Sequence, residues 1–279
     1  MVFVKKNTLL LIHIALAFLI ISCSKEAKVK DLQFDIGDSV DETLRPHGVP
    51  YRGQNTDGYI DYGYIGFPDG VVTAVFKRQG MDIHIDPIYA IRFYSDDRLS
   101  PSNSIATAEM SLSPNLLRSN EKAYAATTNL IDQFQRGKWK RFIPKDSVGV
   151  TGRSSILGLS ETMDDRDSTN PIDPALTLNL DEFTLLSKQG AKWIWIADDR
   201  IAQLTVKNSS YGTTESPSYS IDVSFELKDA YDFYEKMHQE EWIKDRGEAG
   251  AKEAAIIFGA EKKQLEEAAI KRGDSVFSN

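Results

Sequence analysis

Asp82, His84 and Asp86 stand at alternate positions and form the pattern in this sequence that comes closest to a metal site. Alternate side chains of a β-strand share one face, so the three would project together. Carboxylates and imidazoles are ligands that divalent cations accept. The neighbouring Ile83 and Ile85 are apolar, however, so the same segment also fits the solvent-facing side of an amphipathic strand. Both interpretations stay open, and the second is simpler because no other histidine lies near in the sequence.

The other catalytic patterns in the sequence are incomplete. Residues 152–156 read Gly-Arg-Ser-Ser-Ile and lack the last glycine of a serine nucleophile elbow. The acidic segment 161–173 lacks the central glycine and closing carboxylate of a calcium loop. Carboxylates are so numerous that they point to no particular pair for hydrolysis. We therefore expect a protein that binds rather than catalyses, without a dissociable cofactor.

Two short motifs have alternative meanings. Lys138, Trp139, Lys140 and Arg141 form a basic and aromatic island in an acidic chain, which could contact anionic headgroups or an acidic partner. Lysines that protect an edge strand from aggregation would look the same. The tetrapeptide at 272–275, Arg-Gly-Asp-Ser, spells an adhesion motif, but its glycine is more simply the C-cap of a helix.

The amino terminus has the pattern of a secretion signal. Lys5 and Lys6 precede an apolar run over 9–21, which is too short to span a bilayer as a helix. The run ends in Ile20-Ile21-Ser22-Cys23, and this sequence resembles the lipobox of a bacterial lipoprotein precursor. The resemblance covers residues 1–23 and implies cleavage of 1–22 and covalent lipid on Cys23.

The lipid on Cys23 would be a lasting membrane anchor, because each buried acyl CH₂ contributes about 0.8 kcal/mol. Cys23 is the single cysteine in the chain, so an intrachain disulfide is excluded. Ser24 follows it where an aspartate would imply retention in the inner membrane, so the resemblance implies the inner leaflet of the outer membrane, facing the periplasm.

Charge narrows the choice of partner. The 279 residues include 33 basic and 41 acidic side chains. Without Lys5 and Lys6, 31 basic residues face 41 acidic ones, a net charge of −10. Nucleic acid is an unsuitable main partner for such a chain, since phosphate binding needs clustered cations.

Periodicity and turn residues predict an α+β protein with a largely antiparallel sheet, one central helix and a C-terminal helical segment. We expect the central helix to begin with Asn120 as its cap and to end at Gly137, and the C-terminal helices to be broken at Gly247. Strands at 193–197 and 201–207 should form a hairpin, whereas 144–176 should be a surface loop. The expected regions are a cleaved signal (1–22), a lipidated tether (23–50), an α+β body (51–226) and C-terminal helices (227–279). Leu32, Phe34 and Ile36 alternate, so part of the tether could add a strand to the body.

An anchor joined to a folded body without a complete catalytic pattern predicts a lipid-anchored envelope protein that works by protein–protein binding. Its most concrete form is an immunity-type lipoprotein that neutralises an envelope-targeting toxin, such as a type VI secretion effector. An acidic body suits a basic toxin, because opposite charge speeds the encounter. Two alternatives stay open: an outer-membrane assembly or scaffold lipoprotein that docks through its C-terminal helices, and a metal-dependent envelope hydrolase that uses Asp82, His84 and Asp86.

Overall fold

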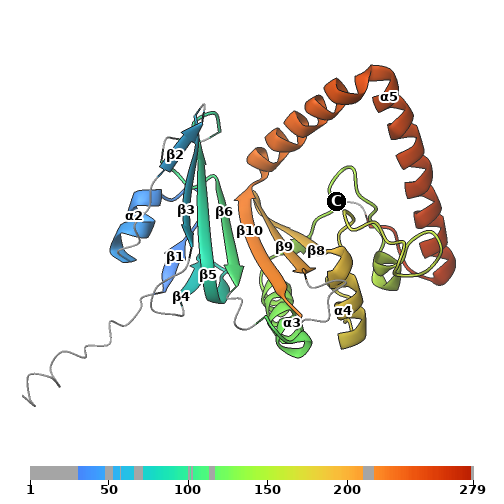
Figure 1. Cartoon of the computed structure of the whole chain (residues 1–279), viewed down its shortest axis with the longest axis horizontal. Helices are drawn as coiled ribbons and strands as arrows, with labels where there is room; N and C mark the ends of the chain where they lie inside the picture. Colours follow the sequence, from blue (N-terminus) through green and yellow to red (C-terminus); the bar gives the residue numbers. More distant parts are fainter. Residues whose placement is uncertain are drawn as a thin grey trace, which may run out of the picture. The chain divides into compact units, whose positions relative to one another are not determined.

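The computed structural model of the chain describes residues 31–47, 53–56, 58–65, 72–99, 101, 103–112, 117–209 and 217–277 (Figure 1). Cys23 and the expected signal peptide lie outside these residues. Within the described ranges, no helix combines the length and apolar character needed to cross a membrane.

One ten-stranded sheet organises the described chain, and it confirms the predicted α+β fold. Its main path runs β1-β4-β5-β6-β10-β9-β8-β7, while β3 pairs with both β2 and β5. Among the described strands the pairing is antiparallel except between β1 and β4. The strands are β1 (Leu32–Phe34), β2 (Gly53–Thr56), β3 (Tyr59–Ile65), β4 (Val72–Phe76), β5 (Ile83–Asp96), β6 (Thr107–Leu112), β7 (Lys140–Arg141), β8 (Ala191–Ala197), β9 (Arg200–Asn208) and β10 (Tyr219–Leu227).

The helices follow the local signals closely. Between α2 (Val40–Leu44) and α5 (Lys228–Arg272) lie α3 (Asn120–Arg136) and α4 (Leu180–Gln189), with short 3-10 turns η1 (Arg45–His47) and η3 (Gly152–Ile156). The cap of α3 is Ser119, whose Oγ accepts from the Lys122 amide, so the prediction of Asn120 was wrong by one residue. Asn120 instead accepts a hydrogen bond from the Tyr219 hydroxyl at 2.8 Å.

The two faces of the sheet differ in polarity. Along β10 the side chains of Ile221, Val223 and Phe225 are fully buried, whereas those between them are more exposed, as the two-residue period requires. The apolar face packs against α3, where Phe134 stacks on Trp195 with ring centroids 4.1 Å apart. The opposite face carries polar residues on β6 and β10 and a small apolar cluster that includes Ile194 of β8 and Ile201 of β9. The candidate site lies on this opposite face.

The expected tether is shorter than the sequence suggested. Leu32 and Phe34 are buried in β1, and Arg200 Nη2 donates to the Ile36 carbonyl at 2.9 Å. The alternation of Leu32, Phe34 and Ile36 gives this segment an apolar side that the core can bury. Residues 31–47 therefore belong to the folded body, which corrects the predicted 23–50 boundary.

The prediction that residues 144–176 form a surface loop is also wrong. Val148, Val150, Ile156 and Ile172 are buried there. Arg166 is 6% exposed, and its Nε donates to the Ser155 carbonyl at 3.1 Å. The polar groups of this segment satisfy one another, so a chain with few apolar residues can still be packed inside.

The C-terminal helix α5 consists of two halves that meet at Gly247, where φ is 73° and ψ 158°, as predicted. Figure 1 shows α5 leaving the end of β10, turning, and coming back toward the segment that follows β7. Gly273 ends it in the left-handed region at φ 87°, which a residue without Cβ adopts at little cost. The adhesion-like tetrapeptide is therefore a helix terminus.

Candidate functional site

A cavity of about 560 Å³ lies between the polar face of the sheet and the first half of α5. We call it the acidic cleft. Residues of β3, β5, β6, β9 and β10 line the cleft, so distant parts of the chain meet in one place. Its aromatic and titratable lining residues are Tyr59, Tyr94, Tyr231, Tyr234, Glu109, Glu226, Glu235, Arg98 and His238.

Strand register brings two of the glutamates together. Ser224 of β10 pairs with Glu109 of β6, and Glu226 pairs with Thr107. Glu109 and Glu226 are therefore diagonal neighbours on the same face of the sheet. Glu235 of α5 approaches them from the helix side of the cleft. Three carboxylates thus converge from two strands and a helix.

Glu226 is the carboxyl group of the cleft whose acidity is clearly altered. Withdrawal from water raises its pKa, and the like charges of Glu235 and Glu109 raise it further, to about 7. Near neutral pH the side chain is therefore divided between its neutral and ionised forms. A cation placed beside it would favour the ionised form, because an opposite charge lowers the pKa of a carboxyl.

Tyrosines provide the aromatic part of the wall. Tyr59 and Tyr94 stack with their ring centroids 5.2 Å apart. Burial raises the pKa of both phenols, so they remain neutral at physiological pH. The Tyr94 hydroxyl donates to Glu109 Oε2 at 3.1 Å and accepts from Arg92 Nη1 at 3.2 Å. This network fixes both the ring and the carboxylate.

Asp96 attaches α5 to the cleft. This aspartate is fully buried and accepts from Arg98 Nε at 2.8 Å, Arg98 Nη2 at 2.6 Å and the Tyr234 hydroxyl at 2.8 Å. The hydrogen bonds from Arg98 are the main reason that the pKa of Asp96 is lowered. Arg98 also lies 5.1 Å from the centroid of the Phe233 ring. Its charge is balanced by Asp96 rather than by the cleft glutamates.

The acidic cleft has the chemistry of a cation site. Carboxylates accept charge-assisted hydrogen bonds from guanidinium or ammonium groups, and the faces of tyrosine rings attract the same groups. None of the site residues predicted from the sequence belongs to this cleft. The alternation of Ser224 and Glu226 with buried neighbours marks a polar sheet face, but no local signal places α5 above that face.

The predicted metal ligands lie on β5 and just before it, and both carboxylates have partners of their own. Asp82 accepts from the Arg78 amide at 2.9 Å and pairs with Lys77, while Asp86 accepts from Thr73 Oγ1 at 3.2 Å. His84 is exposed, and its amide donates to Gln133 Oε1 at 2.7 Å. In the described parts of the chain, no three His, Cys, Asp or Glu residues are grouped to hold a metal. The exposure pattern is that of an amphipathic strand.

The predicted basic and aromatic island does not form one exposed patch. Trp139 is buried, and its Nε1 donates to the Met81 carbonyl at 3.0 Å. The Arg141 side chain is 7% exposed, and its Nη2 donates to the Val150 carbonyl at 2.7 Å. Lys138 and Lys140 are exposed. Lys140 and Arg141 form β7, the terminal strand of the sheet's main path, and Lys140 is the exposed residue of that pair.

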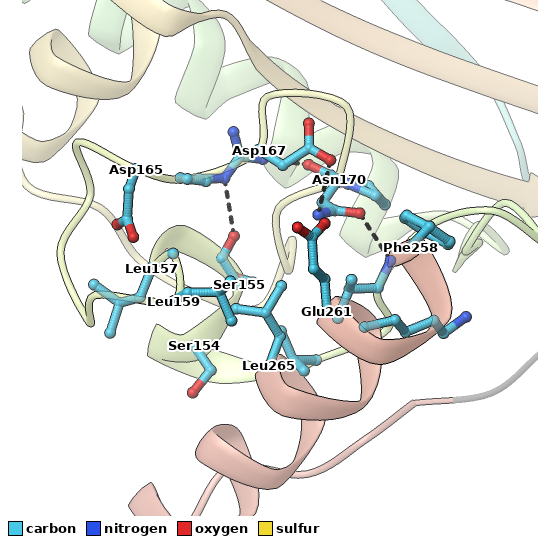
Figure 2. Close-up of a pocket in the computed structure, with 16 residues that line it drawn as sticks. Ser154, Ser155, Leu157, Leu159, Asp165, Asp167, Asn170, Phe258, Glu261 and Leu265 are labelled. Carbon is cyan, nitrogen blue, oxygen red and sulfur yellow. Dashed lines mark hydrogen bonds between the residues drawn. The ribbon is translucent and has the colours of Figure 1, made fainter. Parts of the chain in front are cut away.

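A second cavity, of about 180 Å³, lies between residues 148–171 and the second half of α5, and we call it the arm pocket. Figure 2 shows Glu261 and Leu265 of α5 facing the segment that carries Ser155 and Asn170. Asn170 Oδ1 accepts from the Val148 amide at 2.8 Å. Polar groups of residues 148–171 hydrogen-bond one another within this segment. The acidic cleft is therefore the better candidate for a ligand site.

Comparison with known proteins gives no match to a family model, a curated protein or a solved structure.

Proposed function

We propose that this chain is a lipid-anchored protein of the bacterial cell envelope that acts by binding another protein, and that the acidic cleft receives a cationic segment of that partner. The most concrete form of the proposal is an immunity-type lipoprotein whose partner is a basic, envelope-targeting toxin. The observation that carries the binding part is the convergence of Glu109, Glu226 and Glu235 beside four tyrosines.

Electrostatics supports a cationic rather than a neutral ligand. Glu226 keeps a pKa of about 7 because it is withdrawn from water and because two like charges lie nearby. A guanidinium or ammonium group would relieve that repulsion, so part of its binding free energy would come from removing an unfavourable interaction. The partner's charge would also raise the association rate, an effect that salt screens.

A binding experiment with a defined probe tests the cleft. The full chain in detergent is titrated with an arginine-rich peptide and with the same peptide carrying glutamine in place of arginine. We expect saturable binding of the first peptide only, weakened roughly tenfold or more by each of Glu109→Gln and Glu226→Gln, since a charge-assisted hydrogen bond contributes about 1.5–3 kcal/mol. Glu240→Gln is the matched control, because Glu240 lies exposed on α5. Equal affinity in all three variants would contradict the proposal.

The anchor and the biological role need their own tests. Labelled palmitate should be incorporated into the native chain and not into Cys23→Ala, and only the native chain should fractionate with membranes. For the immunity role, expression of the chain should protect cells from a toxin encoded beside its gene. Loss of protection on Glu226→Gln would connect that role to the cleft, and absence of protection would remove the role while leaving peptide binding intact.

A scaffold function is a second candidate, and the exposed middle of α5 favours it. Ile256 and Ile257 are adjacent, 65% and 53% exposed, on the second half of this helix. Neighbouring exposed isoleucines are typical of contact surfaces. Ile256→Asp with Ile257→Asp should reduce the size of a detergent-extracted assembly, whereas Ile270→Asp, an exposed isoleucine near the helix end, should not. An assembly of unchanged size in the double variant would count against the scaffold.

A further inference from the structure

The last residues of the described chain pair with the body. Val276 forms an antiparallel bridge with Val150. The Thr151 amide donates to the Ser275 carbonyl at 2.8 Å, and the Phe277 amide donates to the Gly149 carbonyl at 2.5 Å. Residues 273–277, which we call the tail, thus return to the segment that carries η3.

Side chains strengthen this attachment. Asp274 Oδ2 accepts from the Ser154 amide at 2.9 Å and from Ser154 Oγ at 2.6 Å. Arg272 Nε donates to Ser154 Oγ at 2.9 Å, and its Nη1 lies 3.2 Å from Glu161 Oε1. Glycines at 149 and 152 leave the room that the tail occupies, since a Cβ at either would collide with Phe277 or Asp274. Both the tail and residues 149–154 therefore contribute to the attachment.

Between its two ends α5 has little support. Ala230 and Ala269, near the ends, are fully buried, but the side chains from 238 to 250 are partly or fully exposed. Gly247 interrupts the helix there, and nothing lies within 4 Å of the position that its Cβ would take. The second half covers the arm pocket instead of filling it (Figure 2). Such a helix relies on its end contacts.

We infer that α5 is a latched strap. The tail is the latch, Gly247 is the hinge, and the first half of α5 is the wall that the latch holds over the acidic cleft. Release of the tail frees the second half, and the first half then keeps its place through contacts near its own start, such as those with Asp96 and Phe142. The latch therefore controls how open the cleft is. This inference goes beyond the proposed function, because it holds whatever the cleft binds.

An engineered disulfide can close the latch. The hydrogen bonds on either side of Val150 and Val276 make them a non-hydrogen-bonded antiparallel pair, whose Cα atoms lie about 4.5 Å apart. That separation is within the range of natural disulfides. In the full chain, the double variant Val150→Cys with Val276→Cys should therefore lock the tail on oxidation. Reduction breaks the disulfide and returns the tail to its unlocked state. Each single-cysteine variant controls for the substitutions.

Hydrogen exchange provides the readout, independent of any ligand. Asp274→Ala should raise amide exchange about tenfold through both halves of α5, because charge-assisted hydrogen bonds of the latch are lost. Oxidation of the cysteine pair in the Asp274→Ala chain should reverse this rise, and β8 and β9 should not change. Ser275→Ala is the matched control, since it keeps the backbone bonds of the tail.

Two results would overturn the strap. Exchange that rises only in the tail, with residues 228–246 unchanged, would show that the first half does not depend on the latch. If Asp274→Ala unfolds the chain, the oxidised and reduced forms of the double-cysteine variant, without Asp274→Ala, provide the test by themselves. Equal exchange over 228–246 in those two states would also refute the inference.

Discussion

Replacing Glu226 with glutamine should stabilise the protein at high pH and leave it unchanged at low pH. The folded chain holds the pKa of this carboxyl at about 7, against 4.5 for an ordinary glutamate. A group with a raised folded pKa binds its proton more tightly in the folded than in the unfolded chain. The wild type therefore loses stability as the pH rises from 4.5 to about 7, and the loss is complete above that range.

The size of this stability difference follows from the difference between the folded and unfolded pKa values. At 1.36 kcal/mol for each pH unit, the difference between 4.5 and about 7 corresponds to about 3 kcal/mol. Glutamine resembles the protonated side chain and carries no charge, so Glu226→Gln avoids this cost. We expect a free energy of unfolding about 3 kcal/mol above the wild type at pH 8, and a difference near zero at pH 4.5.

Urea unfolding at several pH values, followed by the fluorescence of the buried Trp193 and Trp195, measures this difference. Glu240→Gln is the control, because an exposed carboxylate should change the free energy of unfolding by less than about 0.5 kcal/mol. A gap between Glu226→Gln and the wild type that is the same at pH 5 and pH 8 would refute the reasoning. It would mean that Glu226 is hydrated or paired with a cation in the folded chain.

Three further predictions concern binding and packing. The affinity for an arginine-rich peptide should rise between pH 6 and pH 8 as Glu226 ionises, and isothermal titration should show no such rise in Glu226→Gln. Phe134→Ala should cost about 3–5 kcal/mol of unfolding free energy, because the ring is fully buried and stacks on Trp195; a loss below 1 kcal/mol in urea unfolding would contradict this packing. Ser119→Ala should cost about 1 kcal/mol by removing the cap of α3, whereas Ser275→Ala, in an exposed stretch, should be close to neutral in thermal unfolding.

The amino-acid sequence by itself determined much of the local structure. Gly137 ends helix α3 where predicted, Gly190 follows the last residue of α4, and Gly247 and Gly273 break and end α5. The hairpin of β8 and β9 has its turn where the acidic residues 198–199 interrupt two apolar strands. These features depend on helix and strand periods and on backbone preferences within a few residues, which a single sequence displays. The lipid on Cys23 also comes from a local motif, and it stays a prediction.

Tertiary structure alone decided which distant residues meet. Ser154 and Asp274 are 120 residues apart and still form the latch, and Glu109 reaches Glu226 only because β6 pairs with β10. The segment 144–176 looked like a surface loop because its polar residues are many, yet Arg166 finds its partners inside the fold. Hydrophobic pattern and turn chemistry specify elements one at a time. The acidic cleft and its strap arise from how those elements pack, and packing depends on contacts that no short stretch of sequence contains.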